Sequence, residues 1–128
     1  MPRHPKPTAA ELQILVVLWR RGPSTVNQVQ PELHHGDRVG YTTILKLLQI
    51  MHAKGLVRRD ESTRPHVFRA AVAEAQVRQR FVTDLLDQVF GGSATSLAMH
   101  ALATKRATRE ELRKLRELLD EIEGGGAG

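Results

Sequence analysis

The chain has 128 residues, with 19 Lys and Arg against 14 Asp and Glu, 41% hydrophobic residues and no cysteine. A chain of this length usually forms one domain or two small ones, and the lack of cysteine excludes disulfides, thiol catalysis, Cys-containing zinc sites and iron–sulfur clusters. No secretory leader is recognisable and no apolar run approaches the ~20 residues needed to span a bilayer, so we expect a cytoplasmic protein.

The charge is unevenly distributed along the chain. Residues 1–72 hold 11 Lys and Arg against 5 Asp and Glu, whereas residues 73–128 hold 8 against 9. A basic part followed by a near-neutral, leucine-rich part suggests a module that binds a polyanion joined to an assembly module. An ordinary solvated surface would explain the charge alone equally well, so the choice depends on the elements described next.

Residues 1–7 contain three prolines and are predicted to form a short flexible arm. A helix is expected directly after the arm, because Thr8 and Glu11 have the spacing of a capping box. Apolar residues then recur at the spacing of one buried helical face, at Leu12, Leu15, Val16 and Trp19. Gly22-Pro23 is expected to end this helix.

Two further helices are expected before residue 56. Ser24 can cap the second one, which ends at His34-His35-Gly36-Asp37. The third covers residues 41–54, and Gly55 is its expected left-handed stop. Its apolar face carries Ile44, Leu47, Leu48 and Met51.

Residues 56–72 are predicted to form a β-hairpin, because β-branched and aromatic residues flank the turn-rich Glu61-Ser62-Thr63-Arg64-Pro65. Pro65 cannot donate to a ladder, so one strand is expected to begin at or just after it. Three helices followed by a hairpin is the order of a winged helix, a helix-turn-helix variant. We therefore expect a mainly α fold with a small β-hairpin wing and a winged-helix DNA-binding domain over residues 8–72.

The third helix and the wing carry the residues expected to contact DNA. The helix has the right size for the major groove of B-DNA, and the hairpin tip can reach the phosphate backbone or the minor groove. Arg58 and Arg59 point to opposite faces of the sheet, so at most one of them is expected to meet DNA. The predicted DNA-binding residues are Thr42, Thr43, Lys46, Gln49, Arg58 and Arg64.

Residues 73–123 are predicted to form a helical dimerisation domain, followed by a flexible tail over 124–128. Gly91-Gly92 breaks the first of its helices, Ser93 caps the second, and Thr108 with Glu111 forms a second capping box. The apolar stripes are too long for one winged helix to cover, and a homodimer would bury them while pairing two recognition helices. The predicted interface residues are Val77, Phe81, Leu85, Val89, Leu97, Leu112, Leu115, Leu119 and Ile122.

No enzyme or metal site is expected. The densest potential ligand set is His34, His35 and Asp37, but adjacent residues chelate one metal poorly, and no zinc motif is present. The serines lack a nucleophile-elbow setting, and there is no glycine-rich phosphate loop. We therefore expect no catalytic residue, no cofactor and no small-molecule substrate.

The chain resembles the penicillinase repressor family of bacterial transcriptional regulators, of the BlaI/MecI/CopY type. The resemblance is carried in order by TAAELQILVVLWRRGPSTVNQV, YTTILKLLQIMHAKGLVRRD, RPHVFRAAV, FVTDLLDQVFGGS and REELRKLRELLDE. It implies a homodimer whose winged helices bind a palindromic operator in double-stranded DNA, with Thr42, Thr43, Lys46 and Arg64 facing the DNA.

The resemblance also implies how repression could end, and it shows departures from the family pattern. In the family a membrane sensor protease can cut the repressor at an Asn-Phe bond, and the matching position here is His100-Ala101. Ile50 stands where members often have Arg. The cysteine-rich tail of copper-responsive members is absent, which excludes copper sensing through thiolates.

These observations predict a dimeric, sequence-specific transcriptional repressor that is released by a signal. The alternative from another class is a winged-helix module that docks a protein partner without sequence-specific DNA binding. That alternative predicts weak DNA binding that does not depend on sequence.

Overall fold

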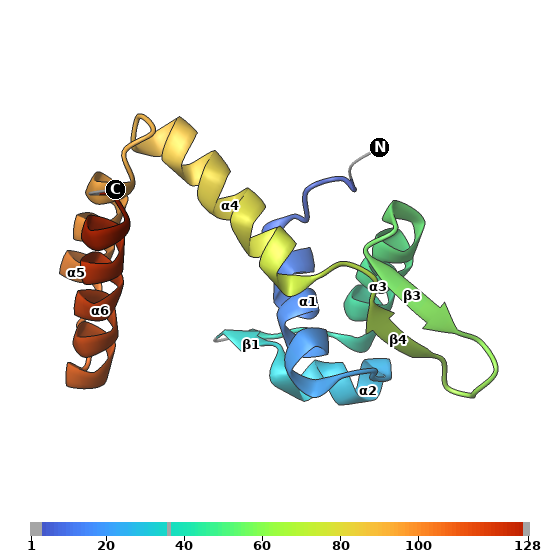
Figure 1. Cartoon of the computed structure of the whole chain (residues 1–128). Helices are drawn as coiled ribbons and strands as arrows, with labels where there is room; N and C mark the ends of the chain where they lie inside the picture. The colour runs from blue at the N-terminus through green and yellow to red at the C-terminus, as the bar shows by residue number, and fades with distance from the viewer. Residues whose placement is uncertain (1–3, 36, 127–128) are drawn as a thin grey trace. The chain divides into compact units, whose positions relative to one another are not determined.

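The computed structural model describes residues 4–35 and 37–126. It contains the expected helices and wing, together with one short β-ribbon that the sequence did not suggest (Figure 1). In chain order the elements are α1 (Ala9–Arg21), α2 (Val26–Val29), the 3₁₀ helix η1 (Gln30–Glu32), β1 (His34–His35), β2 (Asp37–Arg38), α3 (Tyr41–Lys54), β3 (Val57–Asp60), β4 (Val67–Ala70), α4 (Glu74–Val89), α5 (Ala94–Thr104) and α6 (Arg109–Gly126).

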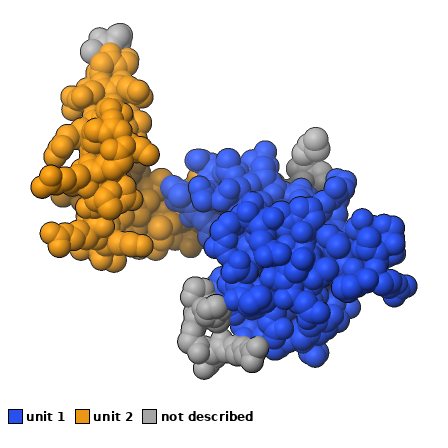
Figure 2. Space-filling model, turned by 90° about the horizontal axis from the view of Figure 1, so that it is seen from below, with its two compact units in different colours: residues 1–82 blue, residues 83–128 orange. Residues whose placement is uncertain are grey.

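The structure divides into two compact units, residues 1–82 and 83–128 (Figure 2). The division falls inside α4, ten residues after the boundary expected at 72/73. The first half of α4 therefore belongs with the winged helix. No helix in the described part of the chain is both long and apolar enough to cross a membrane.

Helix α1 begins with the predicted capping box. The Thr8 amide donates to Glu11 Oε1 at 2.9 Å, and the Glu11 amide donates to Thr8 Oγ1 at 3.2 Å. The buried face is rotated from the predicted one, since Val16 is 42% exposed and Leu12 is half-buried. The side chains that α1 buries are Glu11, Ile14, Leu15, Val17 and Leu18.

Trp19 packs against the core as predicted and is half-buried. Its indole Nε1–H donates to the carbonyl oxygen of Val72 at 3.0 Å. The apolar part of the indole ring thus packs against the core, and its polar N–H has an acceptor, as is usual for a buried or half-buried tryptophan. This contact joins the end of α1 to the segment between the wing and α4.

The loop between α1 and α2 corrects the prediction for Ser24. Thr25 is the N-cap of α2, and it forms a capping box with Gln28. Ser24 is fully buried instead and makes a β-bridge with Phe68 of the wing, with two backbone hydrogen bonds of 2.9 and 2.8 Å. The expected exit at residues 34–37 also differs, because β1 and β2 pair there as an antiparallel ribbon.

Helix α3 has the predicted bounds. It ends at Gly55, whose backbone is left-handed at φ 82° and whose amide returns to the carbonyl of His52. Ile44, Leu48 and Met51 are completely buried. They join the core formed by α1, α2, α3 and the inner face of the wing, and this packing fixes which side of α3 faces outward.

The wing is a two-stranded antiparallel sheet of β3 and β4. Its register pairs Val57 with Ala70, Arg58 with Arg69, Arg59 with Phe68 and Asp60 with Val67. Phe68 is 1% exposed, so Arg59 lies on the same, core-facing side and Arg58 on the other.

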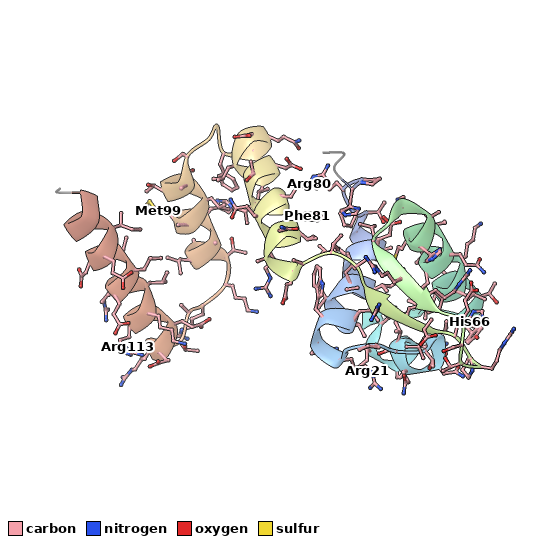
Figure 3. All side chains as sticks on the ribbon, turned by 45° about the vertical axis from the view of Figure 1, so that its right-hand side comes forward. Arg21, His66, Arg80, Phe81, Met99 and Arg113 are labelled. Carbon is pink, nitrogen blue, oxygen red and sulfur yellow. The ribbon has the colours of Figure 1, made fainter. Side chains whose placement is uncertain are left out.

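The N-terminal segment differs from the predicted free arm over its described part, residues 4–7. Pro7 is buried, and the carbonyl of His4 accepts a hydrogen bond from Arg80 Nη1 at 2.5 Å. Lys6 Nζ lies 4.5 Å from the centre of the Phe81 ring, a cation–π distance. Figure 3 labels Arg80 and Phe81 on α4. Residues 4–7 therefore contact α4 at Arg80 and Phe81, within the first unit.

In the second unit, α5 and α6 lie side by side (Figure 1). Gly91 and Gly92 have φ values of 57° and 81°, which other residues rarely adopt, and Ser93 caps α5 as predicted. The second capping box also forms, between Thr108 and Glu111. Helix α6 continues through Gly126, so the expected flexible tail is helical at residues 124–126.

Candidate nucleic-acid interface

The outward face of α3 carries the polar residues that the sequence predicted for it. A helix turns by roughly 100° per residue, so Thr42, Lys46 and Gln49 lie on one side of α3, opposite the buried Ile44, Leu48 and Met51. All three are exposed. Thr43 is exposed on the flank of this face, and Ile50 beside it is 39% exposed.

The position of α3 is fixed by an ion pair as well as by the core. Lys54 Nζ donates to both carboxylate oxygens of Glu11, at 3.0 and 2.8 Å. Glu11 is only 1% exposed. Burial works to raise the pKa of Glu11, but the hydrogen bonds from Lys54 and Thr8 outweigh it and hold the pKa below its ordinary value. The carboxylate therefore stays ionised and ties the start of α1 to the end of α3.

The tip of the wing is a polar turn. The Asp60 carboxylate accepts hydrogen bonds from the Ser62 hydroxyl at 2.6 Å and from the Ser62 amide at 2.9 Å. These two bonds lower the pKa of Asp60 below its ordinary value. Arg64 is exposed next to this turn, so the tip presents a cation on an ordered loop.

The two arginines of β3 have different surroundings. Arg58 is exposed and lies opposite Arg69 on the outer face of the hairpin. Arg59 is half-buried on the inner face and lines a groove between α3 and the wing, together with Tyr41, Gln49, Arg64 and His66. Figure 3 labels His66 on the hairpin. Arg58, which the sequence analysis lists as a DNA contact, lies on the face of the hairpin opposite this groove.

Of the residues predicted for the dimer interface, those nearest the winged helix are covered by their own chain. Val77 is 8% exposed, and Phe81 is half-buried under Lys6. Val77 therefore leaves little surface free for a second chain.

The remaining interface residues are more open. Leu97 and Leu115 are half-buried and the others exposed, with Val89 at 64% and Ile122 at 60%. Helices of a soluble monomer rarely leave so many large apolar side chains exposed to solvent. The open set is Leu85, Val89, Leu112, Leu119 and Ile122.

The His100-Ala101 bond, which the sequence resemblance implies as a possible cleavage position, lies in α5. His100 and Ala101 are exposed, and the ring of His100 meets that of Phe90 edge to face at a centroid distance of 5.8 Å.

The described residues contain no cluster of three or more side chains suited to a metal ion. The set His34, His35 and Asp37 is outside the side chains that the structure describes.

Comparison with known proteins identifies the family. The family described as "Penicillinase repressor" matches residues 7–121. The penicillinase repressor of Staphylococcus aureus is 20% identical over 88% of this chain and 90% of its own length. The transcriptional regulator BlaI of Mycobacterium tuberculosis is 29% identical over 90% of this chain and 83% of its own.

Solved structures of similar proteins include wild-type MarR from Escherichia coli, with a TM-score of 0.49 at 19% identity over 91% of this chain and 77% of that one. A MarR family regulator from Silicibacter pomeroyi has a TM-score of 0.47 at 18% identity, over 97% of this chain and 71% of that one.

The match to the family covers nearly all of the described chain and includes both units. Its named members are repressors and transcriptional regulators rather than enzymes, in agreement with the lack of a catalytic motif in the sequence. The winged helix and the helices that follow it are the architecture expected from the resemblance. The chain belongs to the penicillinase repressor family.

Proposed function

We propose that the protein is a dimeric, sequence-specific repressor that binds a palindromic operator through two winged helices. The observation that carries the proposal is the arrangement of α3. One side is locked in the core by Ile44 and Leu48, and the opposite side presents Thr42, Lys46 and Gln49 to solvent. Short polar and cationic side chains on an outward helix are suited to read base edges in the major groove.

Contacts to the phosphate backbone would come from the wing and from the flank of α3. Arg64 at the wing tip and Thr43 on α3 are exposed on the same unit. Such contacts position a protein on the duplex, whereas base contacts specify the sequence. Repression then needs no chemistry, since a bound dimer blocks access to the promoter.

The second unit would supply the dimer contact. Residues of α4 and α6 leave large apolar side chains exposed, including Val89, Leu119 and Ile122. The apolar residues of α6 repeat with the spacing of a coiled-coil seam, at Leu112, Leu115, Leu119 and Ile122. A second copy of the chain with twofold symmetry would cover these residues and place two α3 helices on two half-sites.

We extend the proposal to release of the operator by proteolysis between His100 and Ala101 by a membrane sensor protease. A cut there would separate α6 from the winged helix and remove the seam residues from the DNA-binding part. Mass spectrometry of the chain from cells before and after derepression is the test. A fragment ending at His100 is expected, and an intact chain in derepressed cells would contradict this route of release.

The experiment that tests DNA recognition is fluorescence-anisotropy binding of the full chain to the duplex upstream of its own gene. A scrambled duplex is the control, and both are measured at two salt concentrations. Preference for the upstream duplex by ~10³-fold or more, with strong salt dependence, is expected for a specific repressor.

Equal binding to both duplexes would exclude autoregulation. Selection from random-sequence DNA is then the next measurement. A chain that enriches no sequence there would not be a specific repressor, and the protein-docking alternative would replace it.

A further inference from the structure

The groove between α3 and the wing has a volume of about 320 Å³. Its α3 wall is formed by residues one turn apart, Tyr41, Leu45 and Gln49, and its other wall by the hairpin. Gln49 belongs both to this wall and to the outward face of α3. The groove therefore continues the surface proposed to face DNA and lies between its two parts.

The groove has an apolar floor and a basic rim. The buried Val26 and Phe68 form its base, while Arg59, Arg64 and His66 contribute nitrogen donors. Among the described residues that line it, none is acidic. A groove with this rim is suited to an anion that approaches from the outward side of α3.

Arg59 has a donor that lacks a partner. Its Nε is buried and has no hydrogen-bond partner in the described part of the chain. Its Nη2 pairs with the carboxylate of Glu61, an exposed residue of the wing turn. Buried donors in proteins are nearly always satisfied, and Nε has almost no accessible surface in this conformation, so an acceptor from outside the chain reaches it when the Arg59 side chain turns toward the groove.

We propose that this groove holds one backbone phosphate of the bound duplex, and that Arg59 rather than Arg58 donates to it. The inference rests on the proposed function, because it specifies a contact within the same DNA-binding surface. A guanidinium offers Nε and Nη donors in a fixed fork that matches a phosphate. Rotation of the Arg59 side chain toward the groove lets the phosphate satisfy Nε and compete with Glu61 for Nη2.

The first test compares two neighbouring arginines that differ in the face they occupy. Binding of the full chain to a mixed-sequence duplex is measured over a range of salt concentrations for the wild type, Arg59→Gln and Arg58→Gln. Both variants lose one positive charge. Arg59→Gln is expected to weaken binding about tenfold at low salt and to reduce the slope of log K against log salt by about 0.9 for each winged helix bound. Arg58→Gln is expected to leave the slope unchanged.

A second pair of variants tests the competition with Glu61. Glu61→Gln frees the Arg59 fork and is expected to tighten binding, and the gain should disappear in the Arg59→Gln background. Asp60→Asn removes the same charge one residue away, and it should change the binding affinity equally in the wild-type and the Arg59→Gln backgrounds. Arg59→Lys keeps the charge without Nε, so it should restore the salt slope of the wild type but only part of its affinity.

The outcomes separate this inference from the proposed function. Thermal unfolding first establishes that each variant is folded. Equal loss of slope in Arg58→Gln and Arg59→Gln, or no loss in Arg59→Gln, would overturn the phosphate contact even if the wild type selects an operator. A wild type that binds the mixed duplex without selecting any sequence would overturn the specific repressor while the Arg59 measurements still decide the contact.

Discussion

The carboxylate of Glu11 and the ammonium group of Lys54 form an ion pair across 43 residues of sequence, with Nζ to oxygen distances of 2.8 and 3.0 Å. Glu11 is buried, while the Lys54 side chain is 29% exposed. The pair joins the first turn of α1 to the last turn of α3. It thereby supports the helix that carries the proposed base-reading side chains.

We expect Glu11→Gln to lower the free energy of unfolding by about 1–3 kcal/mol, because the buried end of the pair loses its charge. Gln retains the capping geometry at this position. Urea unfolding at neutral pH provides the measurement. Glu74→Gln is the matched control, since its pair with Arg78 is exposed and should contribute less than about 1 kcal/mol. An equal loss in both variants would contradict a special role for the buried pair.

The same ion pair predicts that the free energy of unfolding depends on pH. The ordinary pKa of Glu11 is 4.5, and its pKa in the folded chain is lower. Its contribution to stability is therefore fully present above the ordinary value and is lost as the pH falls through the lowered, folded-state value. The stability difference between wild type and Glu11→Gln should shrink at acid pH. A difference that is constant from pH 7 to pH 3 would exclude ionisation of Glu11 as its source.

Lys46→Ala should weaken operator binding by roughly 1–3 kcal/mol if Lys46 reads a base edge. Lys46 is on the outward face of α3 and is exposed, so the substitution leaves the core unchanged. Anisotropy titration with a selected operator measures the effect. Lys114→Ala removes the same charge from α6 and should bind as the wild type does. Unchanged affinity in Lys46→Ala would place the DNA surface elsewhere.

Leu115→Asp should convert dimers to monomers that keep a folded winged helix. Leu115 is at the centre of the apolar repeat of α6, and a carboxylate buried there would lack a partner. Sedimentation gives the oligomeric state and circular dichroism the helix content. Lys114→Asp places the same residue outside the repeat and should remain dimeric. Dimers retained in Leu115→Asp would show that this stripe packs within one chain.

Trp19→Phe should cost about 0.5–1.5 kcal/mol, because the carbonyl of Val72 loses its donor. Tyr41→Phe is the comparison, since Tyr41 is 41% exposed and should change stability by less than about 0.5 kcal/mol. Urea unfolding followed by circular dichroism measures both variants, because it does not depend on the single tryptophan. Equal stability of wild type and Trp19→Phe would mean that water replaces the indole donor at no cost.

Local patterns predicted several helix starts and bounds in both units. The capping boxes at Thr8 and Thr108 and the helix over residues 41–54 are confirmed, because each depends on residues within one or two turns. The order of three helices and a hairpin followed directly from these elements.

The features of the fold that the sequence did not predict depend on contacts between residues far apart in the chain. Ser24 has the chemistry of a cap, but Phe68 pairs with it from 44 positions away, and Thr25 takes the capping role. Glu11 is buried although it is charged, because Lys54 neutralises it there. Neither partner could be identified from the sequence around the residue.

The candidate site was predicted in part. The outward residues of α3 followed from helical periodicity, and the structure places Thr42, Lys46 and Gln49 together. For the wing, alternation separated Arg58 from Arg59 but did not say which faced inward. The signal was present in Phe68, an aromatic residue of the predicted hairpin, but using it required the register that pairs Phe68 with Arg59.

The bridge between Ser24 and Phe68 gives the wing a second anchor at its base. The hairpin is joined to α3 through Gly55 and Leu56, and the bridge adds the loop before α2 as a support on the opposite edge of β4. The base of the wing is therefore supported at both edges of β4, and the turn beyond Asp60 extends past this bridge. In the proposed complex the spacing between α3 and the wing would be set before DNA is bound, so little conformational entropy would be lost when both engage the duplex.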